Sequence, residues 1–176
     1  MTAAIISASA SIVVAVLAFL LGQRAQIRQE RREARLARVN SQLRELYGPM
    51  NTLVQTNEQI WEALRATFLP PRDQREASAG SNEWTLWRNQ ALMPTNRKLR
   101  DLIIDHADLI NESEFPQPLR DFCAHVLSLE VEISSEPEGL ARRALIPHPG
   151  DEFVHYVRTS FDQLKARQQE LLGSTM

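Results

Sequence analysis

The feature that most constrains this chain is a run of twenty residues without a charged side chain, from residue 3 to residue 22, which reads AAIISASASIVVAVLAFLLG. An α-helix of about 20 residues crosses the hydrocarbon core of a bilayer, which is about 30 Å thick. A cleaved signal peptide is the alternative, but it has a basic segment before the apolar run and a small-residue cleavage site after it. Here only Met1 and Thr2 precede the run, and LLGQR ends it. The sequence therefore predicts an uncleaved transmembrane anchor over residues 1–22.

The predicted anchor carries small residues at alternating steps of four and three, a spacing that places them along one side of a helix. Lipid tails are as apolar as Leu, so helices in a bilayer associate through close contact at small residues. The predicted packing face consists of Ala4, Ala8, Ser11, Ala15, Ala18 and Gly22. The alternative is that an Ala-rich anchor contains this pattern by chance.

The formal net charge of −2 is the sum of two opposite regions. Residues 24–44 contain seven Arg and two Glu, whereas residues 45–176 contain 13 basic and 20 acidic residues. Positively charged flanks of a transmembrane helix stay in the cytoplasm, which predicts an N-terminus outside and a cytoplasmic C-terminal domain. The lone Cys123 fits a reducing compartment. Arg outnumbers Lys by 18 to 2, as in proteins from GC-rich bacteria, so we expect the bacterial inner membrane.

Residues 23–35 have a helix-forming composition but only one large apolar residue, Ile27. A helix that is polar on all sides is usually a solvated connector, and these residues would hold the next domain about 20 Å from the bilayer. The basic side chains are also expected to attract anionic lipid headgroups. The predicted headgroup contacts are Arg24, Arg28, Arg31, Arg32, Arg35 and Arg38. Nucleic-acid binding is disfavoured, because the rest of the chain is acidic and no aromatic residues interrupt the Arg run.

An apolar stripe with strictly alternating steps of three and four begins at residue 36 and predicts a packed helix. It consists of Leu36, Val39, Leu43, Leu46, Met50, Leu53, Asn57, Ile60 and Leu64. Gly48 and Pro49 interrupt it, and such a pair can end one helix and begin another. The stripe keeps its register across Pro49, so a kinked helix is favoured over a break.

Three more amphipathic helices follow, with a second kink or break at Pro94. They are predicted over residues 83–110, 116–135 and 151–172, with connections over 68–82 and 136–150. The predicted fold is therefore all-α, an antiparallel bundle of about four helices that continues from the transmembrane helix. The expected organisation is an anchor (1–22), a basic stalk (23–35) and a cytosolic bundle (36–176).

No Gly-rich phosphate loop, CxxC pair or GxSxG motif is present, which disfavours the enzyme classes that need them. Metal-ligand spacings pair Glu152 with His155 and Asp121 with His125. Di-metal sites in helical bundles use two Glu-x-x-His motifs and two further Glu residues, whereas this chain has one such motif. We therefore expect no metal, no cofactor and no enzymatic activity.

Four segments, LYGP at 46–49, MPTN at 93–96, HADLI at 106–110 and CAHV at 123–126, resemble segments of uncharacterised bacterial single-pass membrane proteins. The resemblance covers most of residues 36–172 and implies no site residue and no activity. The leading functional hypothesis is a non-enzymatic membrane-anchored scaffold or adaptor that self-associates or docks with a partner protein at the cytoplasmic face. The alternatives are a membrane effector or sensor in bacterial stress or phage defence, and a helical-bundle metalloenzyme. No small-molecule substrate is indicated.

Overall fold

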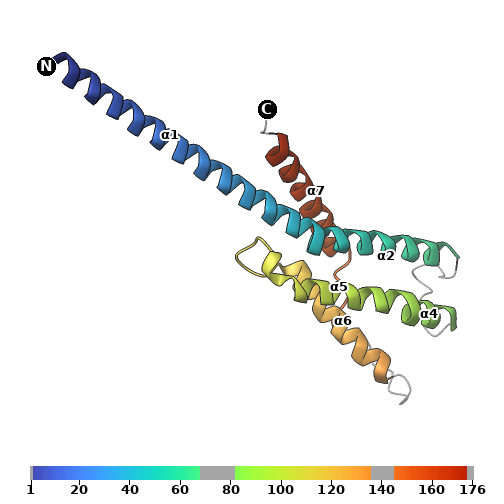
Figure 1. Cartoon of the computed structure of the whole chain (residues 1–176). Helices are drawn as coiled ribbons and strands as arrows, with labels where there is room; N and C mark the ends of the chain where they lie inside the picture. The colour runs from blue at the N-terminus through green and yellow to red at the C-terminus, as the bar shows by residue number, and fades with distance from the viewer. Residues whose placement is uncertain (1, 68–81, 136–144, 174–176) are drawn as a thin grey trace.

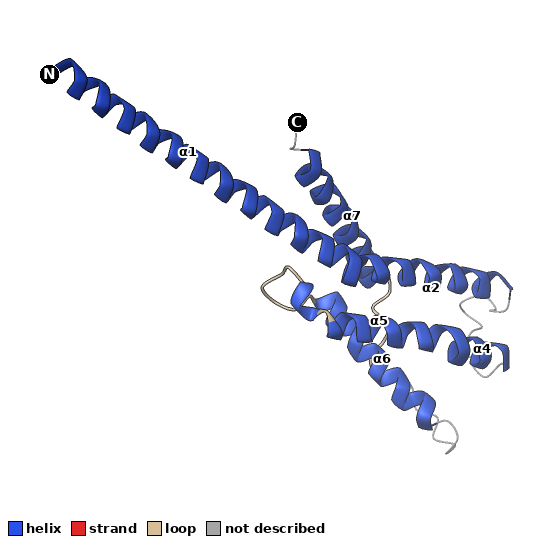
Figure 2. Ribbon diagram, in the orientation of Figure 1, coloured by secondary structure: helices blue, strands red, loops and turns tan. Residues whose placement is uncertain are grey.

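The computed structural model describes residues 2–67, 82–135 and 145–173, with side chains from residue 17 in the first range and from residue 83 in the second. Every regular element in these ranges is a helix (Figure 2). The elements are α1 (Thr2–Ser41), η1 (Gln42–Tyr47), α2 (Gly48–Thr67), α4 (Asn82–Trp87), η3 (Arg88–Leu92), α5 (Met93–Asp105), η4 (Ala107–Leu109), α6 (Gln117–Ser135) and α7 (Asp151–Gly173). The predicted all-helical bundle is confirmed for these residues. The predicted connections lie mostly outside them, at 68–81 and 136–144.

The N-terminal part of α1 extends beyond the rest of the molecule (Figure 1). Residues 17–31 are all exposed. Arg32 is the first partly buried side chain of the described part of α1, and its Nε donates to the carbonyl oxygen of Leu171 in α7 at 2.9 Å. The bundle thus begins inside the segment predicted to be the stalk.

The structure gives no support to a membrane-spanning helix. Over the residues that were described, no helix has both the length and the apolar character that crossing a membrane requires. Most of the predicted span, residues 3–16, lies outside the part of the chain with described side chains, and so do Ala4, Ala8, Ser11 and Ala15 of the predicted packing face. Ala18 and Gly22 of that face are exposed.

A π-helical turn precedes each of the two prolines at which a kink or break is predicted. The Gly48 amide donates to the Leu43 carbonyl, five residues earlier, and the Met93 amide donates to the Arg88 carbonyl in the same way. Proline has no amide hydrogen to donate, so a regular α-helix would lose a hydrogen bond there. The wider turns keep the backbone helical on both sides of Pro49 and Pro94. The axis changes direction between α1 and α2 (Figure 1).

The first π turn also explains the glycine before Pro49. A Cβ atom on Gly48 would overlap the Leu43 carbonyl oxygen, which accepts the hydrogen bond from the Gly48 amide. Any side chain at this position would therefore displace the backbone of the turn.

The prediction that a helix continues to Ile110 is wrong, because α5 ends at Asp105. His106 leaves the helical region with φ −117° and ψ 27°, and η4 follows as a single 3-10 turn. This turn buries Leu109 in the core and presents its carbonyl to Gln42 of η1, whose Nε2 donates to it at 2.6 Å. A tertiary hydrogen bond at the helix end thus accompanies the early termination.

The core lies where α2, α5, α6 and α7 meet. At its centre the rings of Phe122 and Phe153 stack with centroids 4.0 Å apart and planes inclined by 4°. The predicted stripe from Leu36 to Leu64 is buried or half-buried throughout. Gln42, Tyr47, Asn51 and Val54 are buried beside it.

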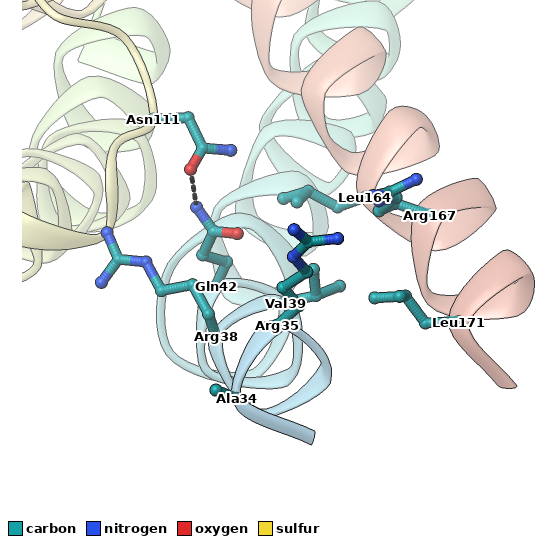
Figure 3. Close-up of a pocket in the computed structure, with 9 residues that line it drawn as sticks. All are labelled: Ala34, Arg35, Arg38, Val39, Gln42, Asn111, Leu164, Arg167 and Leu171. Atoms are coloured by element: carbon teal, nitrogen blue, oxygen red, sulfur yellow. Dashed lines mark hydrogen bonds between the residues drawn. The ribbon is translucent and has the colours of Figure 1, made fainter. Parts of the chain in front are cut away.

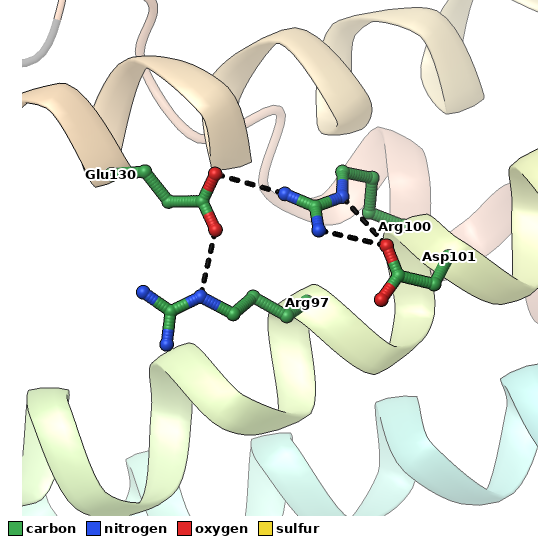
Figure 4. Close-up of polar contacts among 4 residues, drawn as sticks. All are labelled: Arg97, Arg100, Asp101 and Glu130. Carbon is green, nitrogen blue, oxygen red and sulfur yellow. Dashed lines mark hydrogen bonds and ion pairs between the residues drawn. The ribbon is translucent and has the colours of Figure 1, made fainter.

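One carboxylate fastens α6 to α5 through two guanidinium groups (Figure 4). Glu130 accepts from Arg97 Nε at 2.7 Å and from Arg100 Nη1 at 2.9 Å, and Arg100 also binds Asp101. The hydrogen bond from Arg97, together with that from Arg100, lowers the pKa of Glu130. The partly buried Glu130 therefore stays ionised and stabilises the packing of the two helices at neutral pH.

Candidate functional site

Three adjoining cavities follow the surface of α7 and together form one open groove, which we call the α7 groove. The cavities have volumes of about 390, 230 and 460 Å³ in order from the C-terminal towards the N-terminal end of α7. Asn111, Leu164 and Arg167 line both the first and the second cavity, whereas Glu112 and Gln163 line both the second and the third. Neighbouring cavities therefore share walls along α7.

The C-terminal end of the groove, which we call the arginine end, lies between α1 and α7 (Figure 3). Its lining contains three arginines and no acidic residue: Ala34, Arg35, Arg38, Val39, Gln42, Asn111, Leu164, Arg167 and Leu171. The rest of the bundle is acidic, so this end is a local site of positive charge.

Polar contacts from α1 and η1 hold the walls of the arginine end. Gln42, which is 1% exposed, donates from Nε2 to Asn111 Oδ1 at 2.7 Å as well as to Leu109 (Figure 3). Arg38 donates to the backbone carbonyl of Asp108, and Arg32 donates to the last carbonyls of α7. The 108–111 loop and the C-terminal turn of α7 are thus both fixed to the helix that carries Arg35.

The middle of the groove contains a chain of hydroxyl groups that ends on a carboxylate. Tyr156 Oη donates to Glu112 Oε1 at 2.9 Å and lies 3.1 Å from Tyr47 Oη. Because the Tyr156 proton is used on Glu112, the Tyr47 hydroxyl is the donor to Tyr156. Burial raises the pKa of both phenols, so both remain protonated at neutral pH. Neutral phenols held in this way position groups and do not act as bases.

The residues with predicted metal-ligand spacing lie on two helices, Asp121 and His125 on α6 and Glu152 and His155 on α7. Glu152 and His155 line the third cavity with Tyr156. Asp121 accepts a hydrogen bond from Gln117 on its own helix, and His125 donates from Nδ1 to the Ile146 carbonyl at 2.8 Å. Nowhere in the described ranges do three or more His, Cys, Asp or Glu side chains form a group able to hold a metal ion.

The residues before α7 are fastened to α6. Ser128 Oγ accepts from the amides of Leu145 and Ile146, at 2.7 and 3.2 Å. The His148 ring lies edge-on to His125 with centroids 5.0 Å apart, and its Nδ1 accepts from the Gly150 amide at 2.9 Å. Burial of the ring and the neighbouring His125 lower the pKa of His148 to about 4. His125 and His148 therefore have a structural role in placing the start of α7.

The six arginines predicted to contact lipid headgroups divide into two groups. Arg24, Arg28 and Arg31 are exposed on the projecting part of α1. Arg32, Arg35 and Arg38 lie on the part of α1 that packs on the bundle. Arg32 and Arg38 make hydrogen bonds within the protein, and both Arg35 and Arg38 line the groove. The sequence indicated these arginines by their charge. It did not predict the groove, because the groove forms only where α7 packs beside α1.

Comparisons of the chain with protein-family models, with curated proteins and with solved structures found no match. The protein can therefore be classified only by its structure, as a helical bundle with an open groove along α7. The groove offers donors, acceptors and fixed charges, and in its third cavity the Thr159 hydroxyl lies 3.5 Å from His155 Nε2. Its arrangement is suited to binding.

Proposed function

We propose that this protein is a membrane-anchored helical adaptor, in which residues 1–22 anchor the chain and the bundle presents its surfaces to partners at the cytoplasmic face. The carrying observation is the projecting part of α1. Leu17, Phe19 and Leu21 expose 54%, 65% and 65% of their surface there. Contiguous exposed apolar surface marks an interface or a membrane contact, and an unpacked helix is marginally stable in water.

The sequence supports the same placement. The uncharged run over residues 3–22 matches the length of a bilayer-spanning helix, and Arg24, Arg28 and Arg31 directly follow it on the exposed surface. These charges favour an orientation with the bundle on the cytoplasmic side of a bacterial inner membrane. Tethering would raise the effective concentration of the bundle towards partners in the same membrane.

Alkaline extraction of membranes from expressing bacterial cells tests the anchor. The variant Val13→Arg/Val14→Arg places two charges near the centre of the span, each at a cost of about 2.5–3.5 kcal/mol. Its matched control, Gln55→Arg/Gln59→Arg, adds the same charge at exposed positions of α2. Wild type and control are expected in the pellet, and the span variant in the supernatant. Release of wild-type protein into the supernatant would contradict the anchor.

Self-association through the small-residue face is a separate part of the proposal. Ala8→Phe/Ala15→Phe should block close approach of two anchors, and Val13→Phe/Leu17→Phe is a control that introduces the same two Phe side chains at other positions of the helix. Crosslinking in membranes is expected to capture less dimer with the first variant and wild-type amounts with the second. Equal crosslinking by all three proteins would reject this face as the contact.

The location of the α7 groove favours a second candidate, a membrane sensor. The arginine end is lined by α1 on one side and by α7 on the other, so a ligand bound there contacts the helix that leads to the anchor. A sensor requires a ligand whose occupancy changes the helix that carries the signal. Comparing crosslinking between α1 and α7 with and without that ligand would test this candidate, and unchanged crosslinking would reject it.

A further inference from the structure

We propose that the arginine end of the α7 groove binds a small amphiphilic anion, a phosphate or carboxylate group joined to a short apolar chain. The cavity volume of about 390 Å³ lies within the range of small-molecule sites. The inference goes beyond the membrane anchor and does not depend on it, because every residue involved belongs to the bundle.

The charges at this end favour an anion. Arg35 extends into the space between α1 and α7 (Figure 3) and makes no hydrogen bond or ion pair with any residue that the structure describes. Arg167 faces the same cavity from α7 and uses Nη1 on Glu170 at 2.8 Å, which leaves its other nitrogens for a ligand. Arg35 and Arg167 are both exposed and line the same cavity from two helices, and their planar donors match the oxygens of phosphate and carboxylate.

The remaining wall favours an apolar group on the same ligand. Val39, Leu164 and Leu171 line the cavity as part of the hydrophobic core, at no more than 9% exposure. A bare inorganic anion would leave the small exposed part of this wall in contact with water, whereas a short hydrocarbon chain would cover it.

Two sources can supply this chemistry. Arg35 lies thirteen residues after Gly22, or about 20 Å along a helix, so a soluble amphiphile reaches the cavity without the membrane. An anionic phospholipid reaches it only if α1 tilts towards the bilayer surface. The ligand chemistry is the same in both cases, and the lipid composition around the protein separates them.

Calorimetric titration of the full-length protein in phosphatidylcholine nanodiscs, with hexyl phosphate as the probe, tests the proposal. The groove variant Arg35→Gln/Arg167→Gln removes both facing charges, and the control Arg28→Gln/Arg31→Gln removes two exposed charges from the projecting part of α1. Hexyl phosphate is expected to bind wild type and control alike, and the groove variant at least about tenfold more weakly. Inorganic phosphate, without the apolar chain, is expected to bind wild type at least about tenfold more weakly than hexyl phosphate.

Absence of hexyl phosphate binding to wild type, or equal weakening by the two variants, would overturn the proposal. Equal affinities for hexyl phosphate and inorganic phosphate would overturn its apolar part. Unchanged Trp fluorescence of both variants controls for folding.

In nanodiscs containing phosphatidylglycerol, weaker apparent binding of the probe assigns the site to a bilayer lipid, and unchanged binding assigns it to a soluble amphiphile. If the chain does not insert, the same titration in buffer tests the cavity, so failure of the anchor and failure of the site remain distinguishable.

Discussion

Replacing Gly48 with Ala is expected to destabilise the bundle, although Ala is favoured over Gly by about 1 kcal/mol inside most helices. The new methyl group would overlap the Leu43 carbonyl oxygen, and this oxygen also accepts the Gly48 amide. Neither backbone group can move away without weakening the hydrogen bond that closes the π turn. Overpacking in a tight site costs about 1–3 kcal/mol. After the propensity gain of about 1 kcal/mol is subtracted, the net loss should be up to about 2 kcal/mol.

Urea unfolding of the full chain in mild detergent, followed by Trp fluorescence, measures this loss. Trp61 of α2 and Trp84 of α4 lie with ring centroids 5.7 Å apart, so their emission reports the packing of the bundle and not the projecting helix. Gly173→Ala is the matched control, because nothing lies within 4 Å of the Cβ it would add at the end of α7. A midpoint for Gly48→Ala at or above that of wild type would refute the steric argument.

Three further predictions concern hydrogen bonds and titration. Glu130→Gln should lower stability by about 1–2 kcal/mol at pH 7. Because the pKa of Glu130 is lowered in the folded protein, this contribution is present above the ordinary carboxyl pKa and is lost as the pH falls below it, so the denaturation curves of variant and wild type should converge at acidic pH. Tyr156→Phe should cost about 1 kcal/mol in chemical denaturation, because the buried Tyr47 hydroxyl loses its acceptor, and an unchanged midpoint would argue against that bond. Stability should fall as the pH decreases from about 6.5 towards 4, because the unfolded chain then binds a proton that folded His148, with its pKa lowered to about 4, does not. Thermal melts of His148→Gln should show a smaller fall, and equal falls would assign the effect to other groups.

Local signals predicted some helix boundaries and not others. The helix predicted over 151–172 is found as Asp151–Gly173, because acidic residues occupy its first turn and a glycine ends it. The end of α5 at Asp105 is accompanied by a hydrogen bond to the Leu109 carbonyl from Gln42, which lies 67 residues earlier in the chain. Such a tertiary bond leaves no trace in the apolar period of residues 83–110.

The groove was beyond sequence reasoning for a similar reason. Arg35 is recognisable as one member of a basic run, but its place opposite Arg167 follows from the packing of α1 on α7. Tyr47 and Tyr156 are 109 residues apart, and neither has a local signature beyond an aromatic residue near an apolar stripe. Gln42 had a usable signal, since it lies beside Val39 and Leu46 on the buried side of the helix, where a polar residue needs a partner.

The π turn in η1 also sets the rotational phase of the whole N-terminal helix. A π turn holds one residue more than an α-helical turn, so it rotates everything before it by about 100° and shifts it by about 1.5 Å relative to an uninterrupted helix. Arg35 and Val39 lie upstream of this extra residue and face α7. Deleting a single residue within Gln42–Tyr47 would turn them away from α7 and bring another side of α1 to the same position. The one extra residue of the π turn therefore determines which side of the N-terminal helix packs against the bundle.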